Sequence, residues 1–297
     1  MRRNPELRGI LPALVTPLEP DARTVDTLAL QHLVDHVLGA GCSGVVVLGG
    51  TGEYTALSAS QRERAIAATV AHVAGRVPVA VGIVSPGLGD AVQTAQYAER
   101  HGATYVMCVT PYYAAGSQRG ITDWFRLFAA ETSLPIILYN IPSRTGVNLE
   151  PATVANLVEQ VDQIVGIKEC NTSLLHFSQL VGLVGERLAV LSGEDHYALP
   201  HLLTGAQGAV LASANLIPGA WTDLFRAVAS GDVRRAQEIY LRIEPLLNAI
   251  FSELNPGPLK TALRHIGVQV GPVAPPLTAA RPATEDLIVQ SLAALGF

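Results

Sequence analysis

Eight short apolar runs, rich in β-branched residues, recur along the chain. They lie about 20–35 residues apart, which leaves room for one helix after each, and they occupy residues 9–17, 44–48, 77–84, 105–109, 136–139, 164–168, 188–191 and 209–212. Because the runs are continuously apolar, we expect strands that are buried on both faces, as in a parallel sheet. Eight such units favour an α/β fold, a (β/α)8 barrel (TIM barrel), over a Rossmann-type sheet, and no Gly-x-Gly-x-x-Gly follows the first run.

The chain after the eighth run has helical periodicity and no strand signal. Three helical stretches are separated by the Asn-Pro-Gly-Pro turn at 255–258 and by a proline-rich loop at 272–282. We therefore expect residues 1–230 to form the barrel and residues 231–297 to form a C-terminal helical extension of the same domain. Near the second strand, Ser58 and Gln61 have the spacing of a capping box and predict a helix that begins there.

Composition and charge exclude several classes of function. The net charge of −5 gives no electrostatic reason to expect nucleic acid or an anionic membrane as a partner. No apolar stretch reaches membrane-spanning length, and residues 1–6 contain no apolar run of the kind that a signal peptide needs. The three cysteines, Cys42, Cys108 and Cys170, lie in apolar runs, so we expect them to be small buried apolar side chains. Cysteines of this kind, without disulfides, indicate a reducing cytoplasm.

Lysine is rare in this chain, which indicates a special task for each one. Only Lys168 and Lys260 occur among the 20 basic residues, so nearly all the positive charge is carried by arginine. Lys168 ends an apolar run, where a neutral amine could form an imine with a ketone, a reaction that arginine cannot perform. We expect burial to lower the pKa of Lys168, since burial disfavours the charged form. Lys260 lies in a helical context and is interpreted as structural.

Polar motifs stand at the ends of several predicted strands, the edge at which (β/α)8 barrels carry their chemistry. They are Gly-Gly-Thr-Gly-Glu at 49–53, Thr-Pro-Tyr-Tyr at 110–113, Tyr-Asn-Ile-Pro-Ser-Arg-Thr-Gly at 139–146 and Gly-Ile-Lys-Glu at 166–169. The glycine loop could offer converging backbone N–H groups and the Thr51 hydroxyl to a small carboxylate. From composition alone, a simple glycine turn that binds nothing is an equally good interpretation of this loop. Glu53 follows the loop and is expected to brace it.

In this order, the motifs resemble those of the class I pyruvate-dependent lyases typified by dihydrodipicolinate synthase and N-acetylneuraminate lyase. The resemblance covers about residues 9–267. It implies that Lys168 forms an imine with pyruvate, that Tyr139 carries protons, and that Tyr113 crosses a dimer interface to a neighbour's site. It further implies the following substrate-binding residues: Gly50 and Thr51 for the pyruvate carboxylate, Arg144 for a carboxylate on the second substrate, and Gly193, Glu194 and Val210 at the mouth.

The resemblance favours condensation of pyruvate with aspartate semialdehyde to 4-hydroxy-tetrahydrodipicolinate, a step of lysine biosynthesis. One position departs from the pattern: dihydrodipicolinate synthases usually carry threonine where this chain has Gly50, and that hydroxyl links two tyrosines. An aldolase or dehydratase of a 2-keto-3-deoxy sugar acid or of 4-hydroxy-2-oxoglutarate is therefore the alternative. The third hypothesis is a non-catalytic sensor that binds keto acids.

Further expectations follow from the resemblance. We expect no metal or other cofactor, small-molecule substrates only, and a homodimer or homotetramer. Insensitivity to lysine as an effector is also expected, because the positions that bind it in regulated relatives are altered here. Those positions hold Tyr54, Ala59, Arg62 and Pro86, with Asp90 and Tyr112 left as polar partners.

Overall fold

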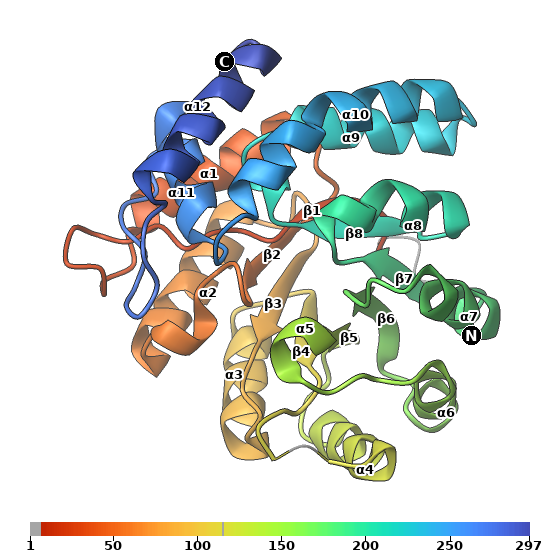
Figure 1. Ribbon diagram of the computed structural model, residues 1–297. Coiled ribbons are helices and arrows are strands. Elements are labelled where there is room, and N and C mark those ends of the chain that lie inside the picture. The colour runs from red at the N-terminus through yellow and green to blue at the C-terminus, as the bar shows by residue number, and fades with distance from the viewer. Residues whose placement is uncertain (1–6, 115) are drawn as a thin grey trace.

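A computed structural model of the protein describes residues 7–114 and 116–297, so the expectation about residues 1–6 falls outside the described part of the chain. Parallel strands form one eight-stranded sheet in the order β1-β8-β7-β6-β5-β4-β3-β2 (Figure 1). Their bounds are β1 Gly9–Pro12, β2 Val45–Leu48, β3 Val79–Ile83, β4 Tyr105–Val109, β5 Ile136–Asn140, β6 Ile164–Glu169, β7 Ala189–Ser192 and β8 Gly208–Leu211. A parallel bridge between Ala13 and Val46 joins β1 to β2 and closes the barrel. The predicted (β/α)8 barrel is confirmed.

Helices alternate with these strands and cover the outside of the barrel (Figure 1). Their bounds are α1 Thr27–Gly39, α2 Ala59–Val73, α3 Leu88–Arg100, α4 Gln118–Ala129, α5 Pro142–Thr145, α6 Pro151–Gln160, α7 Leu174–Val184, α8 Ala198–Thr204 and α9 Pro218–Ala229. The Ser58 hydroxyl accepts the Gln61 N–H at 3.4 Å and caps α2 as predicted. The Gln61 amide oxygen accepts the Val25 N–H at 2.8 Å, so it braces the chain before α1 and the capping box is not reciprocal.

The buried core has two parts, because successive strand residues point to opposite sides of the sheet. The larger cluster lies between strands and helices and includes Ile66, Phe125 and Phe177. The smaller cluster contains alternate strand residues such as Val46 and Leu191 and fills the inside of the barrel. The barrel is therefore a packed core, and open space is left to the loops at its ends.

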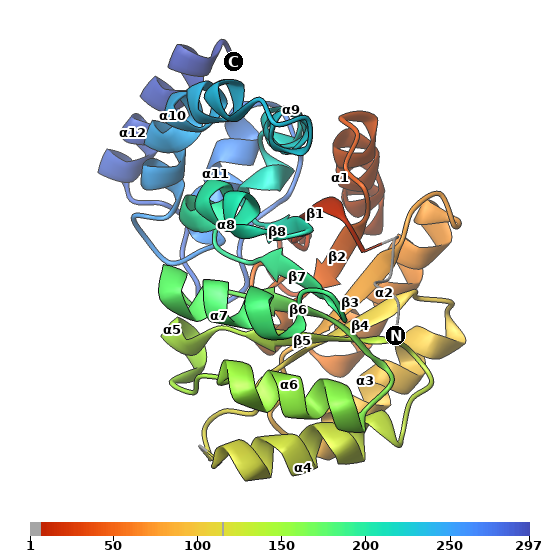
Figure 2. The same cartoon turned by 90° about the vertical axis from the view of Figure 1, so that its right-hand side faces the viewer.

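The C-terminal extension contains the three predicted helices, α10 (Val233–Ile250), α11 (Gly257–His265) and α12 (Pro282–Leu295). The helix α10 packs on α9 and α12, and it also contacts α8 and the short 3-10 helix Asp195–Tyr197 that follows β7. Figure 2 shows the extension gathered on one side of the barrel, on the side away from α4. It thus reaches the loops at the carboxyl ends of the strands.

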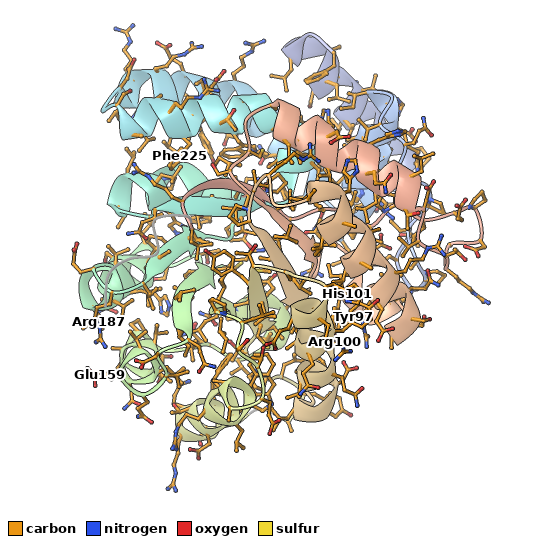
Figure 3. All side chains as sticks on the ribbon, turned by 180° about the vertical axis from the view of Figure 1, so that it is seen from behind. Tyr97, Arg100, His101, Glu159, Arg187 and Phe225 are labelled. Carbon is orange, nitrogen blue, oxygen red and sulfur yellow. The ribbon has the colours of Figure 1, made fainter. Side chains whose placement is uncertain are left out.

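Figure 3 shows the side chains of the molecule from behind. The Tyr97 ring of α3 stacks on the ring of His101, the residue directly after that helix, with centroids 4.1 Å apart. Arg187, which follows α7, pairs with Glu159 of α6 at 3.4 Å. None of the described helices is long and apolar enough to cross a membrane. The three cysteines are free and buried, as predicted.

Candidate active site

A cavity of about 360 Å³ opens at the carboxyl ends of the strands, where the sequence placed the polar motifs. Its wall combines residues at the carboxyl ends of β5 and β6, residues that follow β2, β5, β7 and β8, and the loop between α10 and α11. The predicted site residues that line it are Gly50, Thr51, Tyr139, Arg144, Lys168, Gly193 and Glu194. The closed barrel therefore brings together side chains that are more than 140 residues apart along the chain.

Lys168 and Tyr139 are direct partners in the register of β6 and β5. Lys168 is 6% exposed and Tyr139 is 3% exposed, and the Lys168 Nζ atom lies 4.5 Å from the centroid of the Tyr139 ring. A parallel ladder of this kind fixes the two side chains at the same height inside the barrel. An amine and a phenol are thus held side by side at the bottom of the cavity.

The pKa of Lys168 is raised, which corrects the expectation that it would be lowered. Burial by itself lowers it, but the Tyr139 phenol, the Cys170 thiol, and the Asp195 and Glu194 carboxyls act together in the opposite direction. Burial also raises the pKa of both Tyr139 and Cys170, so these two groups are neutral near pH 7. Near pH 7 the lysine is therefore an ammonium, and a proton must leave Lys168 before it attacks a carbonyl.

Gly193 makes room for the Lys168 side chain. A Cβ atom added at Gly193 would lie 2.8 Å from Cε and Cγ of Lys168 and would collide with Cys170 Sγ. Beside it, the Glu194 carboxyl has a pKa raised to about 7, first by burial and then by the charge of Asp195. Glu194 is therefore the carboxyl on this wall that changes charge near neutral pH.

The glycine loop is rigid where it follows β2. Gly49 has φ +87°, a conformation that glycine adopts readily. A Cβ at Gly52 would lie 2.5 Å from the Leu48 Cα, so the loop folds directly back on the strand. Gly50 lacks such a restraint: its φ is not in the left-handed region, and a Cβ built there would meet only the Tyr139 hydroxyl, at 3.9 Å.

A buried ion pair holds this loop against the extension. The Glu53 and Lys260 side chains are fully buried, with Lys260 Nζ 2.5 Å from Glu53 Oε1. Glu53 Oε2 also accepts the Ala274 N–H at 2.6 Å, and Lys260 Nζ donates to the Pro272 carbonyl at 2.7 Å. The expectations that Glu53 braces the loop and that Lys260 is structural are both confirmed.

A polar network lies directly outside the Lys168–Tyr139 pair. Asn140 and Glu169, the next residues along β5 and β6, are also register partners, and Asn140 Nδ2 donates to Glu169 Oε1 at 2.9 Å. Glu169 further accepts the Asn171 N–H at 2.7 Å and contacts His176 Nε2 at 3.2 Å. This network links the carboxyl ends of β5 and β6 and thereby restrains Lys168 and Tyr139, which lie on the inner face of these strands.

Two predicted site residues lie off the cavity wall. Tyr113 is 97% exposed with φ +73°, an uncommon conformation for a bulky residue, and it does not reach the cavity of its own chain. Val210 is fully buried among the side chains inside the barrel, and Ala212, two residues further on, lines the cavity in its place. The expected position of Val210 at the mouth is therefore corrected to the packed interior.

Among the polar residues of the cavity wall that sequence reasoning did not assign to the site are Asp195 and Asn255. The Asp195 carboxylate accepts the Ala212 and Ser213 N–H groups at 3.3 and 2.8 Å, and it fixes the loop after β8. The Asn255 Nδ2 donates to the Thr51 hydroxyl at 2.9 Å. An acidic residue directly after Glu194 and a polar residue in the 255–258 turn were the only signals available.

A buried lysine and tyrosine at the carboxyl end of a (β/α)8 barrel define a barrel lyase of the class I aldolase type. The sequence matches the dihydrodipicolinate synthetase family over residues 6–294. The chain belongs to this family, which confirms the resemblance drawn from the motifs.

Individual relatives are similar to this chain over nearly its whole length. A 4-hydroxy-tetrahydrodipicolinate synthase of Methanopyrus kandleri is 38% identical over 98% of this chain and 97% of its own. The crystal structure of dihydrodipicolinate synthase from Aquifex aeolicus superimposes with a TM-score of 0.92 at 35% identity, over 96% of this chain and 97% of that one. The lysine-bound enzyme of Cyanidioschyzon merolae gives a TM-score of 0.95 at 31% identity, over 98% and 99%.

Proposed function

We propose that this protein is a Schiff-base lyase that condenses pyruvate with aspartate semialdehyde to 4-hydroxy-tetrahydrodipicolinate, a step of lysine biosynthesis. The observation that carries the proposal is the buried pair of Lys168 and Tyr139 beside the glycine loop, in a chain that is 38% identical to a synthase of that name. A cytoplasmic location fits the three free cysteines, which a reducing compartment preserves.

Lys168 is the nucleophile in this proposal. Its neutral Nζ attacks the keto carbon of pyruvate, and loss of water from the carbinolamine gives the imine. Removal of a proton from the pyruvate methyl group then gives an enamine, whose carbon attacks the aldehyde of the second substrate. The amine of that substrate then attacks the imine carbon, which closes the ring, and Lys168 leaves as the free amine. Tyr139 relays the protons that these steps release and consume, since its hydroxyl is neutral near pH 7 and lies on the neighbouring strand.

The two substrate carboxylates are assigned to different residues of the cavity wall. The loop at Gly50 and Thr51 takes the pyruvate carboxylate, which is thereby held beside Lys168. Arg144, exposed on the short helix α5, takes the carboxylate of the second substrate, for which a guanidinium offers bidentate hydrogen bonds. Gly193 and Glu194 complete the wall next to the imine, and Val210 packs beneath it.

Assembly into a dimer or tetramer is part of the proposal. Tyr113 projects from the loop after β4 with 97% of its surface exposed, as a side chain that serves a neighbouring copy would. A second exposed apolar group lies on α7 and the end of α8, namely Leu174, Leu175, Leu183 and Leu203. Burial of such groups between copies removes apolar surface from water and favours association.

A coupled assay tests the proposed function. Purified protein is incubated with pyruvate and, in turn, aspartate semialdehyde, simple aldehydes, 4-hydroxy-2-oxoglutarate and 2-keto-3-deoxy sugar acids. We expect the highest kcat/KM with aspartate semialdehyde. Efficient turnover of a keto-deoxy acid without turnover of the semialdehyde would assign the alternative function, and silence with every substrate would favour a keto-acid sensor.

Gly50 is the observation that favours the alternative function, and its replacement discriminates between the two. Because Gly50 has no left-handed φ and a Cβ there lies 3.9 Å from the Tyr139 hydroxyl, Gly50→Thr is sterically allowed. In a synthase the new hydroxyl extends the proton relay, so we expect turnover of aspartate semialdehyde to increase, within the ~10²–10⁴-fold that acid–base groups contribute.

In an enzyme for keto-deoxy acids, the same threonine would crowd the pocket and lower their turnover. The matched control is Gly50→Val, which has a similar volume without the hydroxyl. Equal effects of Gly50→Thr and Gly50→Val on the semialdehyde reaction would show that the hydroxyl plays no part, and circular dichroism must confirm that both variants fold.

Lysine is expected not to inhibit this enzyme. Arg62 pairs with Asp90 at 2.8 Å, and its guanidinium lies 4.3 Å from the centroid of the Tyr54 ring. The carboxylate that could hold an effector's ammonium is thus already neutralised by a guanidinium, which would also repel that ammonium. Pro86 offers neither an amide side chain nor a backbone N–H.

Inhibition is measured by titrating lysine against initial rates, with sodium chloride at equal ionic strength as the control. Half-inhibition well below one millimolar would contradict this prediction.

A further inference from the structure

Asn255 lies in the turn between α10 and α11 and contacts both substrate subsites. Its side-chain Nδ2 donates to the Thr51 hydroxyl oxygen at 2.9 Å, and its main-chain carbonyl accepts from Arg144 Nη2 at 3.3 Å. The residue is only 9% exposed and lines the cavity. One residue of the C-terminal extension therefore connects the loop assigned to pyruvate with the arginine assigned to the second substrate.

The hydrogen bond to Thr51 determines which way that hydroxyl points. A threonine hydroxyl has one proton to donate and two lone pairs that accept. When Thr51 accepts from Asn255, its proton remains available for another acceptor. A carboxylate bound at the glycine loop is such an acceptor, and a hydrogen bond to a charged group is stronger than one between neutral groups.

The position of Asn255 is fixed by its surroundings. Two residues later the backbone of Gly257 packs so closely that an added Cβ would collide with the Thr278 carbonyl oxygen. The Lys260–Glu53 ion pair then attaches the start of α11 to the glycine loop itself. Asn255 and Thr51 are thus held at both ends of one small rigid unit, so the direction of their hydrogen bond is built into the fold.

The other polar atom of the Asn255 side chain is its amide oxygen, Oδ1. Within residues 7–114 and 116–297, its Oδ1 atom is buried and has no hydrogen-bond partner. A buried polar atom without a partner destabilises the folded protein and calls for an explanation. This oxygen lies on a residue that lines the cavity, where a donor group of a bound substrate can satisfy it.

We infer that Asn255 is a positioning residue that directs the Thr51 hydroxyl toward the pyruvate carboxylate while its main-chain carbonyl holds Arg144 for the second substrate. The inference rests on the proposed function, because it takes pyruvate as the ligand of the glycine loop. Its consequence is an asymmetry: changes to the Asn255 side chain affect the pyruvate half-reaction, whereas the carbonyl that holds Arg144 belongs to the backbone and remains.

Two substitutions at Asn255 distinguish this role from a merely structural one. Asn255→Ala removes the donor, and we expect kcat/KM for pyruvate to fall about tenfold, with kcat/KM for aspartate semialdehyde changed less than about threefold. Asn255→Asp keeps the shape but is ionised at about pH 8, so Thr51 donates to it and no longer to pyruvate. We therefore expect the isosteric variant to be worse, with a loss of about a hundredfold or more.

A structural role predicts the opposite order, because the isosteric aspartate preserves packing better than alanine. Asn156→Ala, an exposed asparagine on α6, is the surface control. If Asn255→Asp does not fold, a double-mutant cycle of Asn255→Ala with Thr51→Val decides the question. We expect the double variant to lose no more of kcat/KM for pyruvate than Thr51→Val alone, since both changes break one hydrogen bond.

Additive losses in the cycle, a milder Asn255→Asp, or equal losses for both substrates would overturn the inference. The proposed function is judged separately by the wild-type protein. If borohydride traps no pyruvate on the wild type, the proposed function fails. If it traps pyruvate and the Asn255 variants behave as a structural role predicts, only the inference fails.

Discussion

Treatment with pyruvate and borohydride together is expected to leave a reduced adduct on Lys168 and on no other lysine. The only other lysine, Lys260, is fully buried in its ion pair with Glu53 and cannot approach a ketone. Peptide mass spectrometry after digestion locates the adduct. In Lys168→Ala the nucleophile is gone, so we expect no adduct and a loss of kcat of about 10³-fold or more.

The matched control is Lys168→Arg, which keeps a positive charge but never supplies a neutral amine, and it is expected to be equally inactive. An unmodified Lys168, or an adduct on Lys260, would refute the imine mechanism. The raised pKa of Lys168 adds a pH dependence. Since only the neutral amine attacks, and its fraction grows as the pH approaches and passes the pKa, the rate of adduct formation should increase with pH above neutrality.

Activity is expected to return when two inactive variants are mixed, because Tyr113 is assigned to a neighbour's site. Tyr113→Phe lacks the hydroxyl and Lys168→Ala lacks the nucleophile, so each homo-oligomer should lose about 10²-fold or more of its activity. In a mixed dimer, one of the two sites combines the intact Lys168 of one copy with the intact Tyr113 of the other. Unfolding and refolding the two variants together should therefore restore a substantial fraction of the wild-type rate.

The control for this experiment is a mixture of Lys168→Ala with Tyr139→Phe. Both changes lie on the inner faces of neighbouring strands of one chain, β6 and β5. Each site takes both residues from the same copy, so every site of a mixed dimer still lacks either Lys168 or Tyr139, and no activity should return. Equal recovery in the two mixtures, no recovery in the test mixture, or a fully active monomer would remove Tyr113 from a neighbour's site.

The barrel could be predicted from the sequence because its signals are local. Each apolar run is a few residues long and continuously hydrophobic, and the eight strands were found where those runs occur. The register of β5 and β6 then follows from closing the barrel, and it places Lys168 beside Tyr139. The motifs at the strand ends supplied most of the cavity wall for the same reason: the fold fixes where strand ends lie.

The remaining features depend on contacts that no local pattern reports. Asn255 meets Thr51 across 204 residues of sequence, and only the packing of the extension brings them together. The direction of the Lys168 pKa shift depends on the balance between burial and four surrounding groups, of which sequence reasoning considered burial alone. Val210 was placed at the mouth although Ala212, two residues further on, lines the cavity, since a strand pattern gives the face of a residue more reliably than its depth.

The scarcity of lysine has a chemical consequence for an enzyme that handles reactive carbonyl compounds. An aldehyde or a keto acid condenses with any accessible primary amine, whereas guanidinium groups stay protonated and do not form such imines. Here the whole sequence contains two lysine side chains, one sealed in the protein interior and one 6% exposed at the bottom of the cavity. Carbonyl compounds that touch the outer surface therefore find no lysine amine there, so the enzyme resists modification by its own substrates. Amine-directed labels should likewise distinguish this protein from most others, because the cavity offers them their one reachable side-chain target.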